Sequence, residues 1–254
     1  MNDLAIIIVS WNVKDRLREC LSSIFASTHA PLFSVIVVDN ASRDGSADMV
    51  ATEFPNVLLI RNNENVGCSR ALNQGLRVSE SRYVLWLNPD MRLFPDTLRN
   101  LVLYADTHPR AAVVGAKLVN EQGELVPHIR KFPTIIDQFF IISKLARIFP
   151  SLLDSYLCRG FDYEQEASVD SIRGSFFCMR RDVLSKIGML DERFFIWFEE
   201  VDFCKRAIDA GYEVRYTPSI SAIDYVGQSF AQVPVIKKQK MFIASMLKYF
   251  LKHG

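Results

Sequence analysis

The sequence predicts a single α/β domain in which helices flank a central, mostly parallel β-sheet. Short apolar runs rich in β-branched residues alternate with segments of helical periodicity through residues 1–119, which is typical of βαβ units. These runs are apolar on both faces, as in strands buried between two layers of helices. The chain has 254 residues, of which 49% are hydrophobic and 23% charged, so it can bury a core without disulfides.

Five strands and three helices are expected in the first half. The helices cover residues 13–25, 67–79 and 95–107, the last opened by a proline in its first turn. The strands between and after them are residues 4–10, 33–39, 56–62, 83–88 and 111–119.

The alternation of strand and helix breaks after about residue 120. A polar turn is followed by a stretch punctuated by Pro127, Pro133 and Pro150, with an amphipathic segment at 135–149, and a strand is expected over 171–181. Helices closed by Gly188 and Gly211 follow, and then two strands at 213–218 and 219–225. We therefore expect one domain, 1–254, with a nucleotide-binding half (1–119), an acceptor and catalytic-base half (120–233) and a basic tail (234–254).

Composition excludes several classes of protein. With 30 basic and 29 acidic side chains, the chain lacks the basic field of a nucleic-acid binder. Its five cysteines form no Cys-x-x-Cys pair, which indicates reduced thiols in the cytoplasm and no zinc site. No uninterrupted apolar segment reaches the length of a membrane span. No Gly-x-Gly-x-x-Gly follows the first strand, which argues against a dinucleotide oxidoreductase.

Polar residues follow four of the expected strands, at residues 10–12, 39–46, 62–73 and 88–90. Ligands of open parallel sheets bind beyond the carboxyl ends of the strands, so these residues are candidates for a binding site. Each segment taken alone also has the composition of an ordinary turn or helix N-cap.

Five segments together resemble the bacterial glycosyltransferases of family 2, especially the rhamnosyltransferase-like branch. In order and spacing they are VSWN, VVDNASRDGS, NVGCSRALN, LNPD and the long block from RGSFFCMRR to FEEVDFCKRA. The resemblance covers roughly residues 5–230. It implies a GT-A fold, a nucleoside-diphosphate-sugar donor, a divalent metal and inversion at the anomeric carbon.

The resemblance also assigns a nucleotide site. A carboxylate at Asp39 can accept the N3–H of uracil or thymine, and the family uses this position in that way, so the expected donor is a UDP- or dTDP-sugar. Arg70 lies on the helix opened by Gly67, close to where the pyrophosphate should bind, although a solvated helix charge is the alternative. The expected nucleotide-binding residues are Val9, Ser10, Asn12, Asp39, Asn65, Gly67, Arg70 and Asn88.

Metal and base are expected on acidic residues. Asp90 should hold Mg²⁺ or Mn²⁺, because the leaving diphosphate needs a cation. Many relatives have a second acid two residues earlier, where this chain has Asn88. Asp224 stands where relatives often have a histidine, and it is either a substitute ligand or the mark of a lost one. Glu199, Glu200 and Asp202 open a helix, where acids also favour the helix dipole. By resemblance, Glu200 is the catalytic base.

The expected function is transfer of a sugar, with rhamnose as a candidate, to a carbohydrate or lipid-linked acceptor in cell-envelope polysaccharide synthesis. The alternative is a catalytically silent nucleotide-sugar-binding or scaffold protein. Residues 235–254 predict a basic amphipathic helix that lies on the cytoplasmic face of the membrane. Its apolar face could instead pack on its own domain or on a second subunit of a homodimer.

Overall fold

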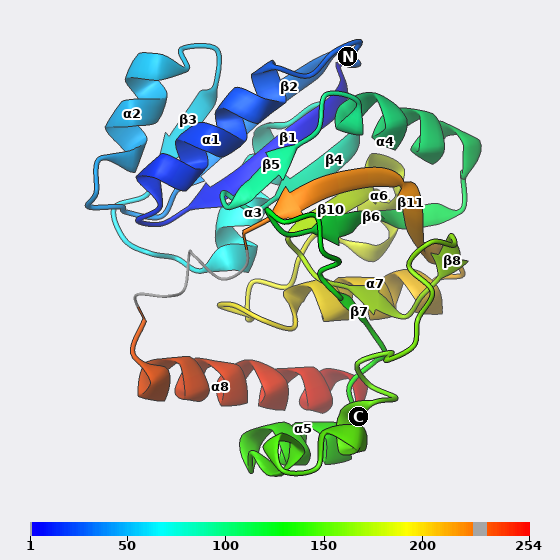
Figure 1. Ribbon diagram of the computed structural model, residues 1–254. Helices are drawn as coiled ribbons and strands as arrows, with labels where there is room; N and C mark the ends of the chain where they lie inside the picture. Colours follow the sequence, from blue (N-terminus) through cyan, green and yellow to red (C-terminus); the bar gives the residue numbers. More distant parts are fainter. Residues whose placement is uncertain (1, 226–232) are drawn as a thin grey trace.

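The computed structural model describes residues 2–225 and 233–254 and shows an α/β fold with one dominant sheet (Figure 1). The strands run in the order β3-β2-β1-β4-β10-β6-β11-β5, and β8 pairs with β11. A separate two-stranded sheet joins β7 to β9. The strands are β1 (Asn2–Ser10), β2 (Phe33–Asp39), β3 (Leu58–Arg61), β4 (Ser81–Leu87), β5 (Met91–Leu93), β6 (Ala111–Val119), β7 (Ile129–Arg130), β8 (Ala167–Ser168), β9 (Ser171–Ile172), β10 (Phe176–Arg180) and β11 (Glu213–Asp224).

Helices cover both faces of this sheet, as the sequence predicted. Buried residues of α1, α2 and α4 form one core with Ile6 and Ile8, whereas α3, α6 and α7 pack on the other face with Ile7. This alternation along β1 is the two-residue period of a strand buried on both sides. The helices are α1 (Lys14–Phe25), α2 (Ser46–Glu53), α3 (Cys68–Val78), α4 (Thr97–Thr107), α5 (Ile135–Ile142), α6 (Arg181–Ile187), α7 (Glu199–Asp209) and α8 (Val235–His253).

Strand direction brings the polar strand ends together. β1, β2, β3 and β4 are parallel neighbours, and their register sets Ser10 opposite Asp39. β10 runs antiparallel between β4 and β6, and β11 is parallel to β6. Segments from both halves of the chain therefore build one continuous sheet.

Several boundaries differ from the sequence expectation. The strand expected over 171–181 is two strands, β9 and β10, because residues 173–175 leave the ladder where Gly174 lies against Trp86; a Cβ there would lie 2.3 Å from the indole ring. The two expected last strands are one strand, β11, with an irregularity between Thr217 and Ser221. The short edge strand β5 was not expected. The segment at 135–149 is α5 followed by a 3₁₀ turn, η1 (Leu145–Arg147), and a second turn, η2 (Pro150–Leu153), comes next.

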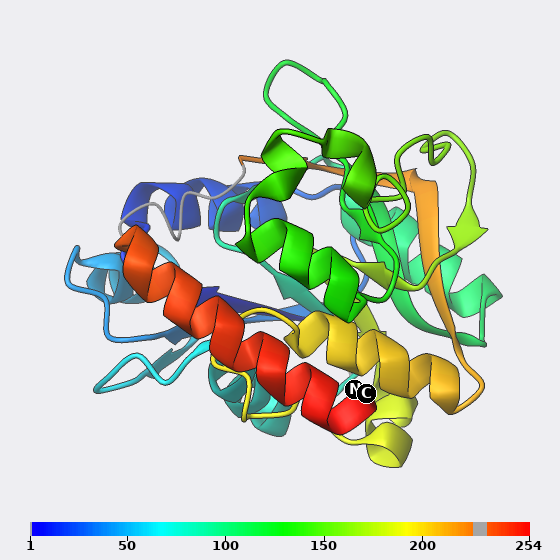
Figure 2. The same cartoon turned by 90° about the horizontal axis from the view of Figure 1, so that it is seen from below.

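The C-terminal helix α8 lies against its own domain, beside α7 and α5 (Figure 2). Its apolar residues Phe242, Met246 and Tyr249 pack with Phe194 and Phe198, which precede α7. This is the alternative in which the tail packs on its own domain, although Val235, Ile236, Leu247 and Leu251 stay exposed. Within residues 2–225 and 233–254, no helix has both the length and the hydropathy needed to cross a bilayer.

Candidate active site

Asp39 ends β2 with one carboxylate oxygen engaged and the other available. The side chain is 3% exposed, and its Oδ2 accepts a hydrogen bond of 2.9 Å from the backbone N–H of Ser42. Within the described residues, Oδ1 has no hydrogen-bond partner. A buried acceptor without a donor is costly, so a ligand N–H at this position would be favourable.

The loop after Asp39 is fixed to the end of β1. The backbone N–H of Asn12 donates to Ser42 Oγ at 3.0 Å, and the N–H of Arg43 donates to Asn12 Oδ1 at 2.7 Å. Asn12 adopts a left-handed conformation, with φ 53°, which allows this close approach. The predicted nucleotide residue Asn12 therefore positions the loop that carries Asp39, and the neighbouring Ser10 is fully buried.

Four predicted nucleotide residues share a cavity of about 110 Å³ at the carboxyl edge of the sheet. They are Val9, Asn65, Gly67 and Asn88, and the other lining residues are Trp11, Asn40, Cys68, Pro89, Phe195 and Ile196. The structure thus brings together residues from the ends of β1 and β4 and the start of α3.

The glycine of this cavity is required by contact with the loop before α7. Gly67 has φ +88°, and a Cβ on it would lie 2.7 Å from the carbonyl oxygen of Phe195. The backbone N–H of Cys68 donates to that same oxygen at 2.6 Å, and Asn65 Oδ1 accepts from the N–H of Gly67. The nucleotide half is therefore fastened directly to the segment that leads to the acidic cluster.

Arg70 lies farther out. Its guanidinium is 55% exposed and sits 3.4 Å from the carboxylate of Glu192, which also pairs with Arg77. These contacts describe a charged surface pair, in line with the alternative given for Arg70, and its pyrophosphate role stays a prediction.

The predicted metal ligands lie at the ends of two paired strands: Asp90 directly precedes β5 and Asp224 ends β11. Asp224 ends β11 opposite Met91 of β5, and the N–H of Tyr225 donates to the carbonyl of Asp90 at 3.1 Å. Asp90 and Asp224 are 3% and 2% exposed. Among the described residues, no three His, Cys, Asp or Glu side chains gather as a metal site. Two carboxylates fit an Mg²⁺ or Mn²⁺ ion only if donor phosphate oxygens and water supply the other ligands.

The first two acids of α7 have very different surroundings from an ordinary surface carboxylate. Burial, together with the neighbouring charge of Glu200, raises the pKa of Glu199 well above its usual range, and the Cys68 thiol hydrogen-bonds to it. Burial also raises the pKa of Glu200, to about 7, against the opposing effects of backbone hydrogen bonds and the positive charge of Arg173. Glu200 is half-buried, and its Oε2 has no hydrogen-bond partner among the described residues.

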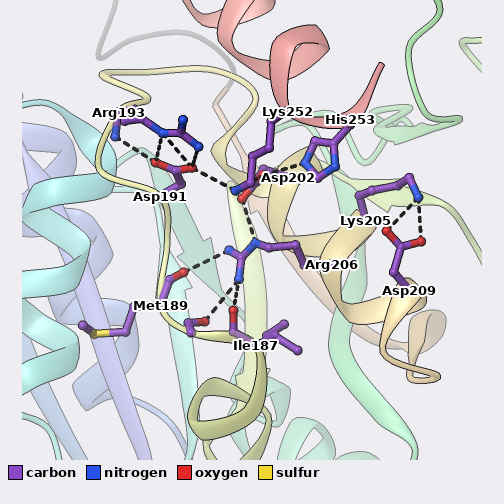
Figure 3. A network of polar contacts seen from close by, with 11 residues as sticks. Ile187, Met189, Asp191, Arg193, Asp202, Lys205, Arg206, Asp209, Lys252 and His253 are labelled. Carbon is purple, nitrogen blue, oxygen red and sulfur yellow. Dashed lines mark hydrogen bonds and ion pairs between the residues drawn. The ribbon is translucent and has the colours of Figure 1, made fainter.

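Asp202, the third acid, belongs to a cluster that holds α8 in place (Figure 3). It is fully buried and lies 2.9 Å from Arg206 Nε, 2.6 Å from Lys252 Nζ and 2.7 Å from His253 Nε2. Lys252 also pairs with Asp191 at 2.8 Å. The carboxylate oxygens of Asp202 are thus occupied by side chains from α7 and α8, which favours a structural role over proton transfer.

Arg173 is the functional candidate that the sequence reasoning missed. Its guanidinium lies 3.4 Å from Asp224, and its charge also acts on Glu200, so it stands between the predicted metal ligand and the predicted base. Its Nε is buried and has no partner among the described residues. The sequence does contain a signal for Arg173: it lies within an expected strand, at the start of Arg-Gly-Ser (173–175), and an arginine buried in a strand needs an anionic partner.

Comparison with known proteins identifies the family of the chain. The family model described as Glycosyl transferase family 2 matches residues 5–188. The chain belongs to this family. The sequence resemblance is thereby confirmed, and the central sheet flanked by helices is the GT-A fold.

Relatives of this family 2 glycosyltransferase include two rhamnosyltransferases. The chain is 27% identical to the N-acetylglucosaminyl-diphospho-decaprenol L-rhamnosyltransferase of Mycobacterium tuberculosis, over 91% of this chain and 78% of the relative. It is 25% identical to the rhamnosyltransferase WbbL of Escherichia coli, over 87% and 82%.

Two solved structures share the fold. A Pyrobaculum calidifontis mannosyltransferase in complex with GDP-mannose and Mn²⁺ superposes with a TM-score of 0.67 at 18% identity, covering 98% of this chain and 66% of that one. The S. aureus protein TarS, residues 1–349, gives a TM-score of 0.60 at 17% identity, covering 98% and 72%.

Proposed function

We propose that this glycosyltransferase transfers a hexose, with rhamnose as the leading candidate, from UDP or dTDP to a hydroxyl of a carbohydrate or lipid-linked acceptor, with inversion. The names of the two rhamnosyltransferase relatives support the sugar. The name of the mycobacterial relative includes N-acetylglucosaminyl-diphospho-decaprenol, a lipid-linked sugar, which supports the lipid-linked class of acceptor.

The observation that carries the proposal is the environment of Glu200. A general base works best when its pKa lies near the operating pH, and burial raises the pKa of Glu200 to about 7. Burial raises the pKa of Glu199 well above its usual range, and Asp202 is held by Arg206, Lys252 and His253. Cys68 links the base to the cavity, because it lines that cavity and interacts with both glutamates.

In the proposed reaction, the Glu200 carboxylate accepts the proton of the acceptor hydroxyl as that oxygen attacks the anomeric carbon. The bond from this carbon to the diphosphate breaks, and attack from the opposite side inverts the configuration. Asp39 holds the pyrimidine through its unpartnered Oδ1. Asp90, with Asp224 as a conditional second ligand, would hold a divalent cation, which supplies charge stabilisation to the diphosphate when bound.

Arg173 has a positioning role in this scheme. Its positive charge beside Asp224 lowers the pKa of Glu200 and keeps part of the base ionised near neutral pH. A guanidinium with an unsatisfied Nε is also suited to contact a phosphate oxygen of the donor.

A panel of nucleotide sugars tests the proposal. UDP- and dTDP-sugars, including dTDP-rhamnose, should raise the unfolding temperature in the presence of Mn²⁺, because a donor at 100 times its Kd stabilises by about 2.7 kcal/mol. GDP-mannose is the purine control. Release of UDP or dTDP with an acceptor present would then identify the reaction. If no pyrimidine donor stabilises the protein or is turned over, the proposal is wrong.

A further inference from the structure

The segment from α5 to η2 carries an unusual concentration of exposed apolar side chains. Of the nineteen large hydrophobic residues exposed among the described parts of the chain, seven fall within residues 135–152. We call these seven the outer apolar face: Ile135, Ile136, Phe139, Ile142, Ile148, Phe149 and Leu152. In Figure 1 this segment lies at the lower edge of the molecule, on the far side of α8 from the central sheet.

Such a face was not expected from the sequence, which placed the membrane contact on the tail. Phe242, Met246 and Tyr249 of α8 pack against Phe194 and Phe198, so these three side chains are not available to a bilayer. Four other apolar residues of α8 stay exposed, fewer than the seven of the outer apolar face. The outer apolar face comes from a different segment, and contiguous exposed apolar surface of this kind marks an interaction site.

Basic side chains accompany the outer apolar face. Lys144 and Arg147 lie within the segment. Together with Lys238 of α8 they line a groove between the segment and α8. Among the described residues, no carboxylate pairs with any of these three cations, whereas the acid Asp137 is engaged with Thr134 in the N-terminal cap of α5. The local charge is therefore positive, and it favours an anionic partner.

We propose that the outer apolar face docks onto an anionic lipid bilayer. Apolar side chains that enter the boundary between headgroups and acyl chains, beside lysine and arginine at headgroup level, are the pattern of interfacial membrane binding. A second copy of the chain is less suitable, because a two-fold interface would bring Lys144 and Arg147 of both copies against each other.

The docking surface borders a groove whose wall includes the segment that precedes the proposed base. A groove of about 570 Å³ opens between this segment and α8, with Trp197 in its wall. Trp197 and Phe198 both have positive φ, 64° and 71°, and turn the chain into α7, where Glu200 lies in the first turn. A docked bilayer would thus lie beside a groove whose wall contains Trp197, three residues before the base in the chain. The relevance of this proximity to a lipid-linked acceptor rests on the proposed function, whereas the docking itself does not.

Vesicle co-sedimentation of the full-length protein, without donor or acceptor, tests the docking. Vesicles of phosphatidylcholine mixed with phosphatidylglycerol should bind the protein at low salt more than about tenfold more tightly than phosphatidylcholine alone. The triple variant I136S/F139S/F149S should lose more than about tenfold in affinity. The control L32S/L58S/L103S removes apolar side chains that are also exposed, but on other elements, and should bind like wild type.

Charge is tested separately. The variant K144E/R147E should lose at least about tenfold, since each cation near an anionic surface contributes roughly fivefold. R99E/K186E makes the same change in net charge at other exposed positions and should lose much less. Equal melting temperatures would show that the variants are folded.

Absence of wild-type binding, or equal losses in test and control variants, would overturn the proposal. It would also be overturned if the serine variant changed only the monomer–dimer equilibrium in ultracentrifugation, because the face would then join two copies. Failure of the nucleotide-sugar panel would leave this result unaffected, since the binding assay contains neither substrate.

Discussion

Replacing Glu200 with glutamine should remove the catalytic base while preserving the site. Glutamine has nearly the same shape as glutamate but cannot accept the proton of the acceptor hydroxyl at neutral pH. We expect kcat to fall roughly 100- to 10,000-fold, with donor affinity nearly unchanged.

The pKa of Glu200 sets the pH dependence of the wild-type enzyme. With a pKa raised by burial to about 7, about half of the enzyme carries the ionised base at pH 7 and about one tenth at pH 6. Therefore kcat/KM should fall about fivefold between these two values and rise less than twofold from pH 7 to pH 8. Replacing Arg173 with methionine removes a cation that lowers this pKa, so the acidic limb of the profile should move to higher pH.

Initial rates of nucleotide release across this pH range provide the assay, and Glu199→Gln is the matched control. Burial holds Glu199 protonated in the folded protein, whereas an unfolded glutamate ionises near pH ~4.3. Its contribution to stability is therefore lost as pH rises above that value, and Glu199→Gln should reduce this loss while retaining activity. A Glu200→Gln enzyme with wild-type turnover, or an acidic limb near pH ~4.3, would refute the assignment of the base.

Three further substitutions test the remaining residues. Asp39→Asn should weaken UDP or dTDP binding about 10- to 100-fold in calorimetry, since it replaces a charged acceptor of the N3–H. Unchanged affinity would show that Asp39 does not bind the pyrimidine ring. Asp202→Asn should lower the free energy of unfolding in urea by about 3 kcal/mol, because Arg206, Lys252 and His253 lose their shared carboxylate; stability equal to wild type would contradict this role. Asp224→Ala should raise the Mn²⁺ concentration needed for half-maximal activity if Asp224 is a metal ligand; the wild-type Mn²⁺ requirement in this variant would leave Asp224 as the partner of Arg173 alone.

The sequence determined the parts of the protein that local patterns record. Apolar runs located β1, β2, β4 and β6, and the polar residues that end or follow them located Asp39 and Asn88 at the edge of the sheet. Strand and helix periodicity depends on neighbours a few residues away, so a single chain is sufficient to reveal it. The sequence did not predict the short edge strand β5 or the division of residues 171–181 into two strands. Both depend on partners distant in the chain, β11 for the first and Trp86 for the second.

The sequence singled out Glu200 among the three acids of α7 only by resemblance, and tertiary structure supplied the physical difference between them. This difference comes from Cys68, Arg173, Lys252 and His253, which lie between 27 and 131 residues along the chain from the acids they contact or act on. The same holds for α8, whose amphipathic pattern fitted a membrane or a protein partner equally well. Hydrophobic periodicity specifies that a face will be buried, but not against what, because the hydrophobic effect has no direction of its own and only the packing of the whole chain supplies the partner.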